Sequence, residues 1–336
     1  MLFRSSAQEE WLKEREAELY EVPALDLKAR RAVTEGYLAR YRKRLSDAQL
    51  ERVVTAEPCE SPLFLTTVLA ELVIFGSFER LDAYIDHLVS SPDLGELFER
   101  MIARFEEDYG TDLTRAALTA LWASRTGLSE DELVGITGFP LVKTSQVTLA
   151  LDQHLKESGG VTHFTHSFLE EAVRDRYLDQ EQLRQARHRE LADWFRESEA
   201  GRRRAEMLNA QVRGAQDWSQ LHRDLTDDEL GTEAIRYLSN QLLFQSWALL
   251  DEHLNLVIEE EYERLWGEGD ERWQRTGDKI SALLTYAGRA TAFQATLYQG
   301  ELRLKRENVE SLGTPDSLRD LSVSLWRVGE ISQARG

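Results

Sequence analysis

The chain has 336 residues, a formal net charge of −19 and one cysteine, Cys59. A single cysteine excludes an intramolecular disulfide and a cysteine-based zinc site, and the acidic charge argues against a surface that neutralises nucleic-acid phosphates. The chain has only 6 Pro and 20 Gly, and this composition favours helix.

Neither a signal peptide nor a membrane span is predicted. The N-terminus, MLFRSSAQEEWLKERE, is charged from residue 9 onward and lacks an apolar stretch, so it does not have the pattern of a signal peptide. The longest apolar run, Leu63–Phe75, contains Glu71 and is too short to cross a bilayer. We therefore expect a cytoplasmic protein that contacts neither membrane nor nucleic acid.

Two dense basic runs, Arg40–Arg44 and Arg202–Arg204, interrupt the acidic composition. Each lies in a mixed-charge helical context, and we interpret each as a solvated helix face.

From the N-terminus, the pattern predicts a helix over Gln8–Leu19 that ends before Pro23. The region from Asp26 to Gly110 is expected to be all helical. In its first helix the apolar spacing places Leu27, Val33, Tyr37, Leu38, Tyr41 and Leu45 close to one face.

Polar caps divide the rest of this region into helices. Ser46 is a predicted helix cap, and Ser61 followed by Pro62 is the preferred order for starting a helix. That helix is expected to stop at Gly76. Helices over Ser77–Val89 and Leu94–Tyr109 complete the predicted bundle.

Residues 111–198 have winged-helix proportions. The pattern predicts a capping box between Ser129 and Glu132 and a short β-hairpin, the wing, around Gly159–Gly160. The predicted helices are Asp112–Arg125, a short one after Ser129, Phe139–Leu155, and a long one that runs from Phe168 to Phe195. The helix Phe139–Leu155, in the place of a DNA-reading helix, has one lysine and no arginine, so it reads as a packing face.

The end of the chain carries a repeat signal. In TPDSLRDLSVSLWRVGEISQARG, the residues Leu325, Val328, Gly329 and Gly336 fall on positions of a tetratricopeptide first helix. A looser copy, LLTYAGRATAF, places Gly288 where the later copy has Gly329. Because the chain ends within a repeat and a solenoid needs several stacked repeats, we expect it to be a fragment or a truncated reading frame.

Two further segments, SPLFLTTVLAELVIFG from Ser61 and THFTHSFLEEAVRDRYL from Thr162, resemble the back half of the ATPase module of STAND-class signalling NTPases. The resemblance is to NACHT proteins with tetratricopeptide repeats, of the nephrocystin-3 and telomerase-associated-protein kind and their bacterial relatives. In that family the first segment lies in a helical domain behind the nucleotide, and the second ends a winged helix that closes over it. The chain has no G-x-x-x-x-G-K-[ST] loop and no Walker B strand.

The resemblance implies a mainly α fold with a helical bundle, a winged helix with a small β-hairpin wing, and the start of an α-helical solenoid. The implied parts are 1–24, a remnant of the NTPase core; 25–110, the helical domain; 111–198, the winged helix; 199–275, a helical linker domain; and 276–336, incomplete repeats.

The resemblance also implies two nucleotide-contacting residues in an intact parent protein. Pro62 matches a proline that lies against the adenine in that family. The alternative interpretation is that Pro62 only starts a helix. His166 matches a histidine that reaches the β-phosphate of ADP, and His163 competes for this role. The family commonly has an arginine where Glu170 and Glu171 stand here, which adds negative charge near the supposed phosphate site.

No other chemistry emerges from the sequence. The set His163, His166, Glu170 and Glu171 lacks the spacing of a zinc site, so no metal is expected. Ser167 lies in no G-x-S-x-G elbow. Cys59 is flanked by Glu57 and Glu60, which should raise its pKa and make it a poor nucleophile.

The sequence therefore predicts a non-enzymatic, regulatory part of a STAND ATPase, which acts as a nucleotide-sensing lid and a partner-sensing arm. It would bind protein partners through its repeats and an upstream NTPase core in cis or in trans. ATP or ADP with Mg would belong to the intact parent, and no cofactor is expected in this chain. The alternatives are a stand-alone tetratricopeptide-type scaffold and a winged-helix transcription regulator, which the charge disfavours.

Overall fold

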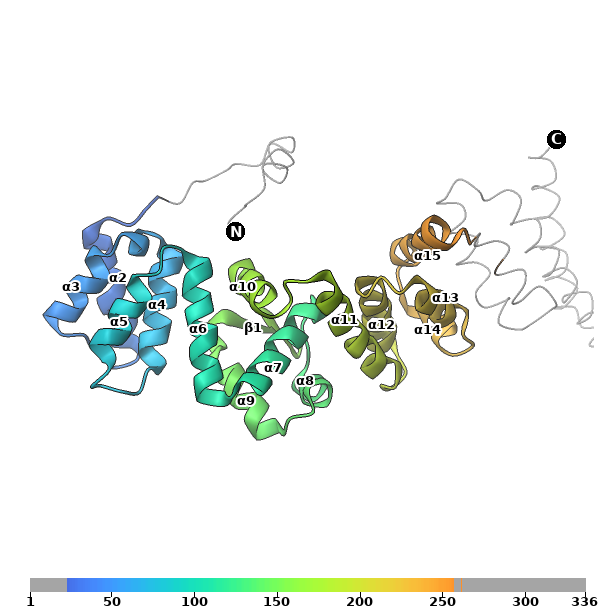
Figure 1. The fold of residues 1–336 in the computed structure, drawn as a ribbon, viewed down its shortest axis with the longest axis horizontal. Coiled ribbons are helices and arrows are strands. Elements are labelled where there is room, and N and C mark those ends of the chain that lie inside the picture. Colours follow the sequence, from blue (N-terminus) through green and yellow to red (C-terminus); the bar gives the residue numbers. More distant parts are fainter. Residues whose placement is uncertain (1–22, 257–260, 262–336) are drawn as a thin grey trace, which may run out of the picture. The chain divides into compact units, whose positions relative to one another are not determined.

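The computed structural model describes residues 23–256 and Glu261 (Figure 1). The predicted helix Gln8–Leu19 and the predicted repeats within residues 276–336 lie outside the described residues. Among the described helices, none combines the length and the apolar character needed to cross a membrane.

The chain divides into two compact units. The first comprises residues up to Thr111 with residues 147–154 and 166–172, and the second comprises residues 112–146, 155–165 and the chain from Val173 onward. The division into five parts that the sequence suggested stays a prediction.

The first unit confirms the prediction of an all-helical region between Asp26 and Gly110. Its apolar α4 packs against α2, α5 and α6 and buries Phe64, Leu65, Val68 and Leu69. The elements are α2 (Leu27–Arg40), α3 (Asp47–Thr55), the 3-10 turn η1 (Glu57–Glu60), α4 (Pro62–Ile74), α5 (Leu81–Val89) and α6 (Leu94–Tyr109).

Three of the predicted helix ends in this unit are confirmed. The Ser46 hydroxyl accepts a hydrogen bond from the Gln49 backbone N–H, in a full capping box. The Ser61 hydroxyl likewise caps α4, with Pro62 at its first position. Gly110 ends α6 with φ of 95°, a left-handed value that suits glycine.

Two predictions in this unit are wrong. Leu27 is 58% exposed, whereas Arg30 is buried and its guanidinium donates hydrogen bonds to the carbonyls of Leu25, Val54 and Ala56. The apolar spacing missed this because a polar side chain fills the inner face. The helix predicted from Ser77 begins only at Leu81, after a loop.

The second unit holds helices around one small hairpin, and the division between the units passes through α9 and α10. The order of three helices, hairpin and helix agrees with the predicted order, although the winged-helix assignment itself stays a prediction. The elements of this part of the chain, of which η2, the end of α9 and the start of α10 belong to the first unit, are α7 (Thr111–Ser124), α8 (Glu130–Thr137), α9 (Leu141–Ala150), η2 (Asp152–His154), β1 (Leu155–Ser158), β2 (Val161–Phe164), α10 (Ser167–Tyr177), α11 (Glu181–Arg196), α12 (Arg202–Gly214), α13 (Trp218–Thr226), α14 (Leu230–Tyr237) and α15 (Asn240–Leu254).

The hairpin lies where the sequence predicts it. β1 and β2 pair antiparallel with Leu155 opposite Phe164, and Gly159 and Gly160 turn the chain with φ of 62° and 79°, as a primed two-residue turn requires. Leu128 adds an isolated antiparallel bridge to Thr162. The two-stranded sheet and this bridge are the β-structure of the described residues.

Two helix predictions in the second half are wrong. The helix predicted over Phe139–Leu155 spans only Leu141–Ala150, because the chain tightens into η2 and then enters β1. The long helix predicted from Phe168 to Phe195 is two helices, α10 and α11. At the break, the Arg184 guanidinium donates to the carbonyls of Leu178 and Asp179, which satisfies the free carbonyls of a helix end.

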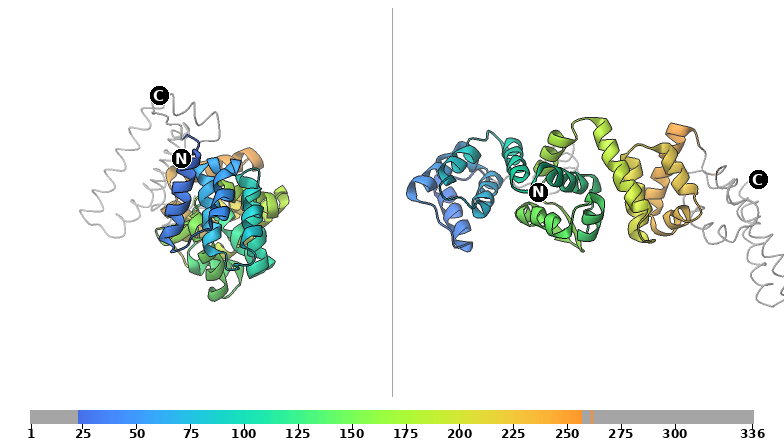
Figure 2. Two further views of the ribbon diagram at one scale, coloured as in Figure 1. Left: turned by 90° about the vertical axis from the view of Figure 1, so that its left-hand side faces the viewer. Right: turned by 60° about the horizontal axis from the view of Figure 1, so that its bottom comes forward.

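The last four described helices, α12–α15, pack against one another along the chain. α12 contacts both α13 and α14, and α13 contacts both α14 and α15; these helices lie close together in Figure 1 and Figure 2. α12 and α13 thus each pack against the next helix and the next but one. We call α12–α15 the stacked array; it lies before the region that the sequence predicted to hold repeats.

Candidate functional site

Pro62 has the place that the helix-starting interpretation requires. It is the first residue of α4, and the Ser61 side chain accepts a hydrogen bond from the Phe64 backbone N–H. The helix-starting role is therefore confirmed. Its contact with an adenine stays a prediction.

His166 immediately precedes α10, at a helix N-terminus where exposed backbone N–H groups favour an anion. Burial lowers its pKa. In the same unit, His154 is buried and lies edge-on to the Phe98 ring at 5.4 Å between centroids. Burial and then the charge of His166 lower the pKa of His154 to about 4. The His154 imidazole is therefore neutral at pH 7.

His163, the competing candidate, lies in β2 opposite Lys156. Its Nδ1 is buried and has no hydrogen-bond partner among the described residues. His163 belongs to the second unit and His166 to the first. Within residues 23–256, no group of three or more His, Cys, Asp or Glu side chains has an arrangement that could hold a metal ion.

Cys59 is fully buried, and burial raises the pKa of its thiol to about 12. The predicted direction of the shift is confirmed, but its main cause is burial, while Arg30 acts in the opposite direction. A thiol with this pKa is a poor nucleophile.

A polar cluster that the sequence analysis missed lies inside the first unit. Glu71 is 1% exposed and accepts two hydrogen bonds from the Arg104 guanidinium, at 2.8 and 3.2 Å. The Tyr84 hydroxyl donates to the same carboxylate at 2.5 Å. The three side chains satisfy one another, so the cluster reads as structural.

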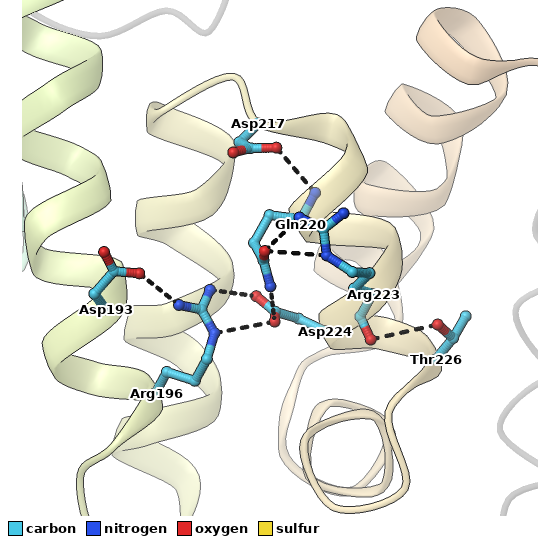
Figure 3. Close-up of polar contacts among 7 residues, drawn as sticks. All are labelled: Asp193, Arg196, Asp217, Gln220, Arg223, Asp224 and Thr226. Atoms are coloured by element: carbon cyan, nitrogen blue, oxygen red, sulfur yellow. Dashed lines mark hydrogen bonds and ion pairs between the residues drawn. The ribbon is translucent and has the colours of Figure 1, made fainter.

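A polar cluster also joins α11 to the stacked array. The Arg196 guanidinium donates to Asp224 of α13 at 2.9 and 3.2 Å and to Asp193 at 2.7 Å. Gln220 donates to Asp224 as well, at 2.8 Å, and Asp217 caps α13. Figure 3 shows these side chains converging from the two helices.

The basic run Arg202–Arg204 is not the uniform solvated face that the sequence suggested. Arg204 is 6% exposed, and its guanidinium pairs with Glu233 of α14 at 2.8 Å and with Glu229. Arg203 pairs with Glu132 of α8 at 2.7 Å. Two of the three arginines therefore join α12 to neighbouring helices, and the sequence interpretation is wrong for these two.

Next to these ion pairs, α12, α13 and α14 line a small, partly open pocket of about 20 Å³, with Asn209, Asp224, Glu233 and apolar side chains in its wall. About 10–15 Å³ is enough for one water molecule. The pocket therefore has room for a single water and is too small for a ligand.

The outer surface of the array carries a tyrosine beside two arginines. The Tyr237 ring, at the end of α14, has the Arg202 guanidinium 5.9 Å and the Arg236 guanidinium 5.6 Å from its centroid. Arg202 and Arg236 are exposed and Tyr237 is half-buried. We call these three residues the Tyr237 patch. Tyrosine and arginine are enriched among the residues that contribute most to protein–protein binding.

Comparison with known proteins finds a similarity to a repeat protein. No family model and no solved structure matches the chain. A TPR repeat-containing protein of Dictyostelium discoideum is 26% identical over 231 residues, which are 67% of this chain and 14% of that protein. The chain thus spans about a seventh of that relative's length. The similarity supports the tetratricopeptide part of the expected resemblance, and the NTPase part stays a prediction.

Proposed function

We propose that this chain is a protein-binding helical scaffold. The stacking of α12–α15 carries this proposal, because helices that pack against the next and the next but one form a solenoid-like surface. The similarity to a TPR repeat-containing protein supports it. No catalytic step is part of the proposed function.

The Tyr237 patch is the proposed contact surface of the scaffold. Its aromatic ring and two guanidinium groups offer apolar area, cation–π attraction and hydrogen-bond donors in one place. The side chains are already held on rigid helices, so binding orders few new groups.

The test is to purify proteins that bind the tagged full chain in its source cells, and then to measure the affinity of the best-enriched one. Tyr237→Ala should raise its Kd by about 30-fold, the effect of losing roughly 2 kcal/mol at a central contact. The matched control is Arg223→Ala, because Arg223 is exposed on α13 and its guanidinium donates to Gln220 of the same helix. Equal affinities for all three proteins would contradict the proposed surface.

We further propose that the scaffold is the regulatory part of a STAND-class ATPase, a nucleotide-sensing lid and a partner-sensing arm. The placement of His166 and Pro62 at helix N-termini favours this candidate. In this proposal the two residues contact a nucleotide that an upstream NTPase core holds with Mg, in cis or in trans.

A calorimetric titration tests the nucleotide part. Without a P-loop to cradle phosphates and hold Mg²⁺, the chain alone should neither bind ATP measurably nor hydrolyse it. ATP binding in the micromolar range that survives His166→Ala and Pro62→Ala would overturn this proposal. A P-loop encoded directly upstream, in frame or as a partner gene, would favour the ATPase over a stand-alone scaffold.

A further inference from the structure

A pocket of about 250 Å³ lies in the first unit, between the loop after α2 and the loop between α4 and α5. This volume far exceeds the about 10–15 Å³ that one water needs, and it is below the roughly 300–1,000 Å³ of small-molecule sites. The size therefore suits one large side chain of a partner. The apolar part of its wall consists of Leu38, Leu45, Leu72, Phe75, Phe78 and Leu81.

One aromatic side chain of the pocket wall is held in place, and another is exposed to solvent. Phe75 stacks on the Tyr84 ring with centroids 4.1 Å apart, so its position is fixed. Phe78 lines the same pocket and is 82% exposed. An aromatic side chain that remains in solvent beside an apolar hollow is a ready contact for a partner.

The polar part of the wall is basic. Lys43 and Arg44 line the pocket together with Gly76 and Ser77, and no carboxylate lines it. The Lys43 ammonium donates to the Val73 carbonyl, which holds it beside α4. Arg44 is exposed and pairs with none of the described carboxylates.

The charge around the pocket contrasts with the rest of the chain. The run Arg40–Arg44 carries four of the 41 Lys and Arg residues in a chain of net charge −19. At the pocket-lining Ser77, one charge of each sign is present: the Ser77 hydroxyl donates to the Glu79 carboxylate at 3.4 Å, and the Arg80 guanidinium donates to the same hydroxyl at 3.3 Å. An acidic partner would therefore meet a local attractive potential here, while the remaining surface repels it.

We propose that this pocket binds an acidic segment of a partner protein, which inserts one large apolar side chain between Phe75 and Phe78 while its carboxylates pair with Arg44 and its neighbours. The inference rests on the proposed protein-binding function, but it uses a surface in the other unit. The apolar insertion supplies affinity, and the carboxylate pairs select acidic segments and make binding weaken with salt.

The pocket can be blocked without strain. A Cβ atom on Gly76 would meet nothing within 4 Å, and its φ is not in the left-handed region. Gly76→Trp should therefore fold and place an indole at the pocket. Gly36→Trp is the matched control, because a Cβ on Gly36 in α2 also meets nothing within 4 Å.

The test is fluorescence anisotropy of the full chain with a short labelled peptide that has one tryptophan flanked by glutamates. We expect saturable binding that Gly76→Trp and Arg44→Glu weaken about tenfold or more, while Gly36→Trp and Arg189→Glu, at an exposed arginine of α11, leave it unchanged. Replacing the peptide's tryptophan by alanine, or its glutamates by glutamines, should weaken binding similarly.

Three results would overturn the proposal: no saturable binding of the acidic peptide, equal binding by Gly76→Trp and the wild type, or a self-association that Gly76→Trp abolishes, which would make a second copy the occupant. A partner that binds through the Tyr237 patch and is indifferent to Gly76→Trp would reject the pocket and leave the proposed scaffold function intact.

Discussion

At the scale of single residues, two buried polar side chains should determine how the stability of the first unit responds to pH and to mutation. His154 is 4% exposed, and its Nε2 has no hydrogen-bond partner among the described residues. Glu71 is equally buried but fully paired. The two sites therefore differ: burial keeps the His154 imidazole neutral, whereas the Glu71 carboxylate accepts hydrogen bonds from Arg104 and Tyr84.

The neutral state of His154 predicts a loss of stability in mild acid. Its pKa falls from 6.5 in the unfolded chain to about 4 in the folded chain. Stability is therefore fully present above pH 6.5 and is lost as the pH falls toward 4. Between pH 7 and pH 5, where carboxylates change little, the loss should be about 2 kcal/mol.

Urea denaturation of the wild type and of His154→Phe at both pH values checks this. Phenylalanine keeps the edge-on contact with Phe98 and cannot titrate, so the variant should lose about 2 kcal/mol less than the wild type on acidification. Histidines that do not interact with His154 contribute to both proteins alike, and His154→Phe also removes the coupling between His154 and His166. Parallel losses would contradict the assignment to His154.

In the Glu71 cluster, the stability cost of losing Arg104 should depend strongly on whether Glu71 and Tyr84 remain. Arg104→Leu leaves a buried carboxylate without its cation and should cost about 3–5 kcal/mol. The triple variant Arg104→Leu, Glu71→Leu and Tyr84→Phe removes every member of the cluster and should lose much less stability. Chemical denaturation of both variants measures the difference, and equal costs would show that the pairing itself does not matter.

At the scale of elements, ion pairs join helices that are distant in sequence. Asp224 accepts hydrogen bonds from Arg196 of α11 and from Gln220, so it links α11 to the stacked array. We expect Asp224→Ala to cost about 1.5–3 kcal/mol, as for other lost bonds to charged groups. Arg223→Ala, its exposed neighbour in Figure 3, should stay within about 0.5 kcal/mol of the wild type in thermal denaturation. Similar melting temperatures for the two variants would refute this link.

The start of α8 depends on a glycine. Gly127 has φ of 88°, and a Cβ there would lie 2.7 Å from the Thr162 carbonyl oxygen. Gly127→Ala should therefore cost about 1–3 kcal/mol and break the Leu128–Thr162 bridge. Faster exchange of the Thr162 amide proton would report this. Gly36→Ala is the control, because no atom is close to a Cβ at Gly36, and this variant should gain about 0.5–1 kcal/mol of stability. An unchanged exchange rate of the Thr162 amide proton in Gly127→Ala would count against the prediction.

Most elements could be predicted from local signals in the sequence. Polar pairs between residues far apart in the sequence could not be predicted in this way. The caps at Ser46, Ser61 and Ser129 and the Gly159–Gly160 turn involve neighbours in sequence, so they could be read directly. Arg204 finds its partners 25 and 29 residues away, and a run of arginines does not say which one turns inward. The basic side of the pocket was likewise visible only as the run Arg40–Arg44, because much of the apolar wall, including Leu72, Phe75 and Phe78, comes from a later part of the chain.

At the scale of the whole molecule, the chain has a helical unit with a basic-edged pocket and a second unit with the stacked array. Each unit carries its own candidate surface, Phe78 with Arg44 in one and Tyr237 in the other. A protein that binds through both would gain from effective concentration if its segments span the two sites. The sequence alone pointed to neither surface, since exposure is a property of the folded chain.

The most direct test of the protein-binding scaffold is site-specific photo-crosslinking in the source cells. A photoreactive benzoylphenylalanine replaces Tyr237 in the full chain, and the same amino acid replaces Arg189 as the control position on α11. The account predicts one reproducible protein crosslinked from position 237, absent from position 189 and lost when Arg236→Glu is added. Identical crosslinking from both positions, or none from position 237 while another surface captures the partner, would contradict it.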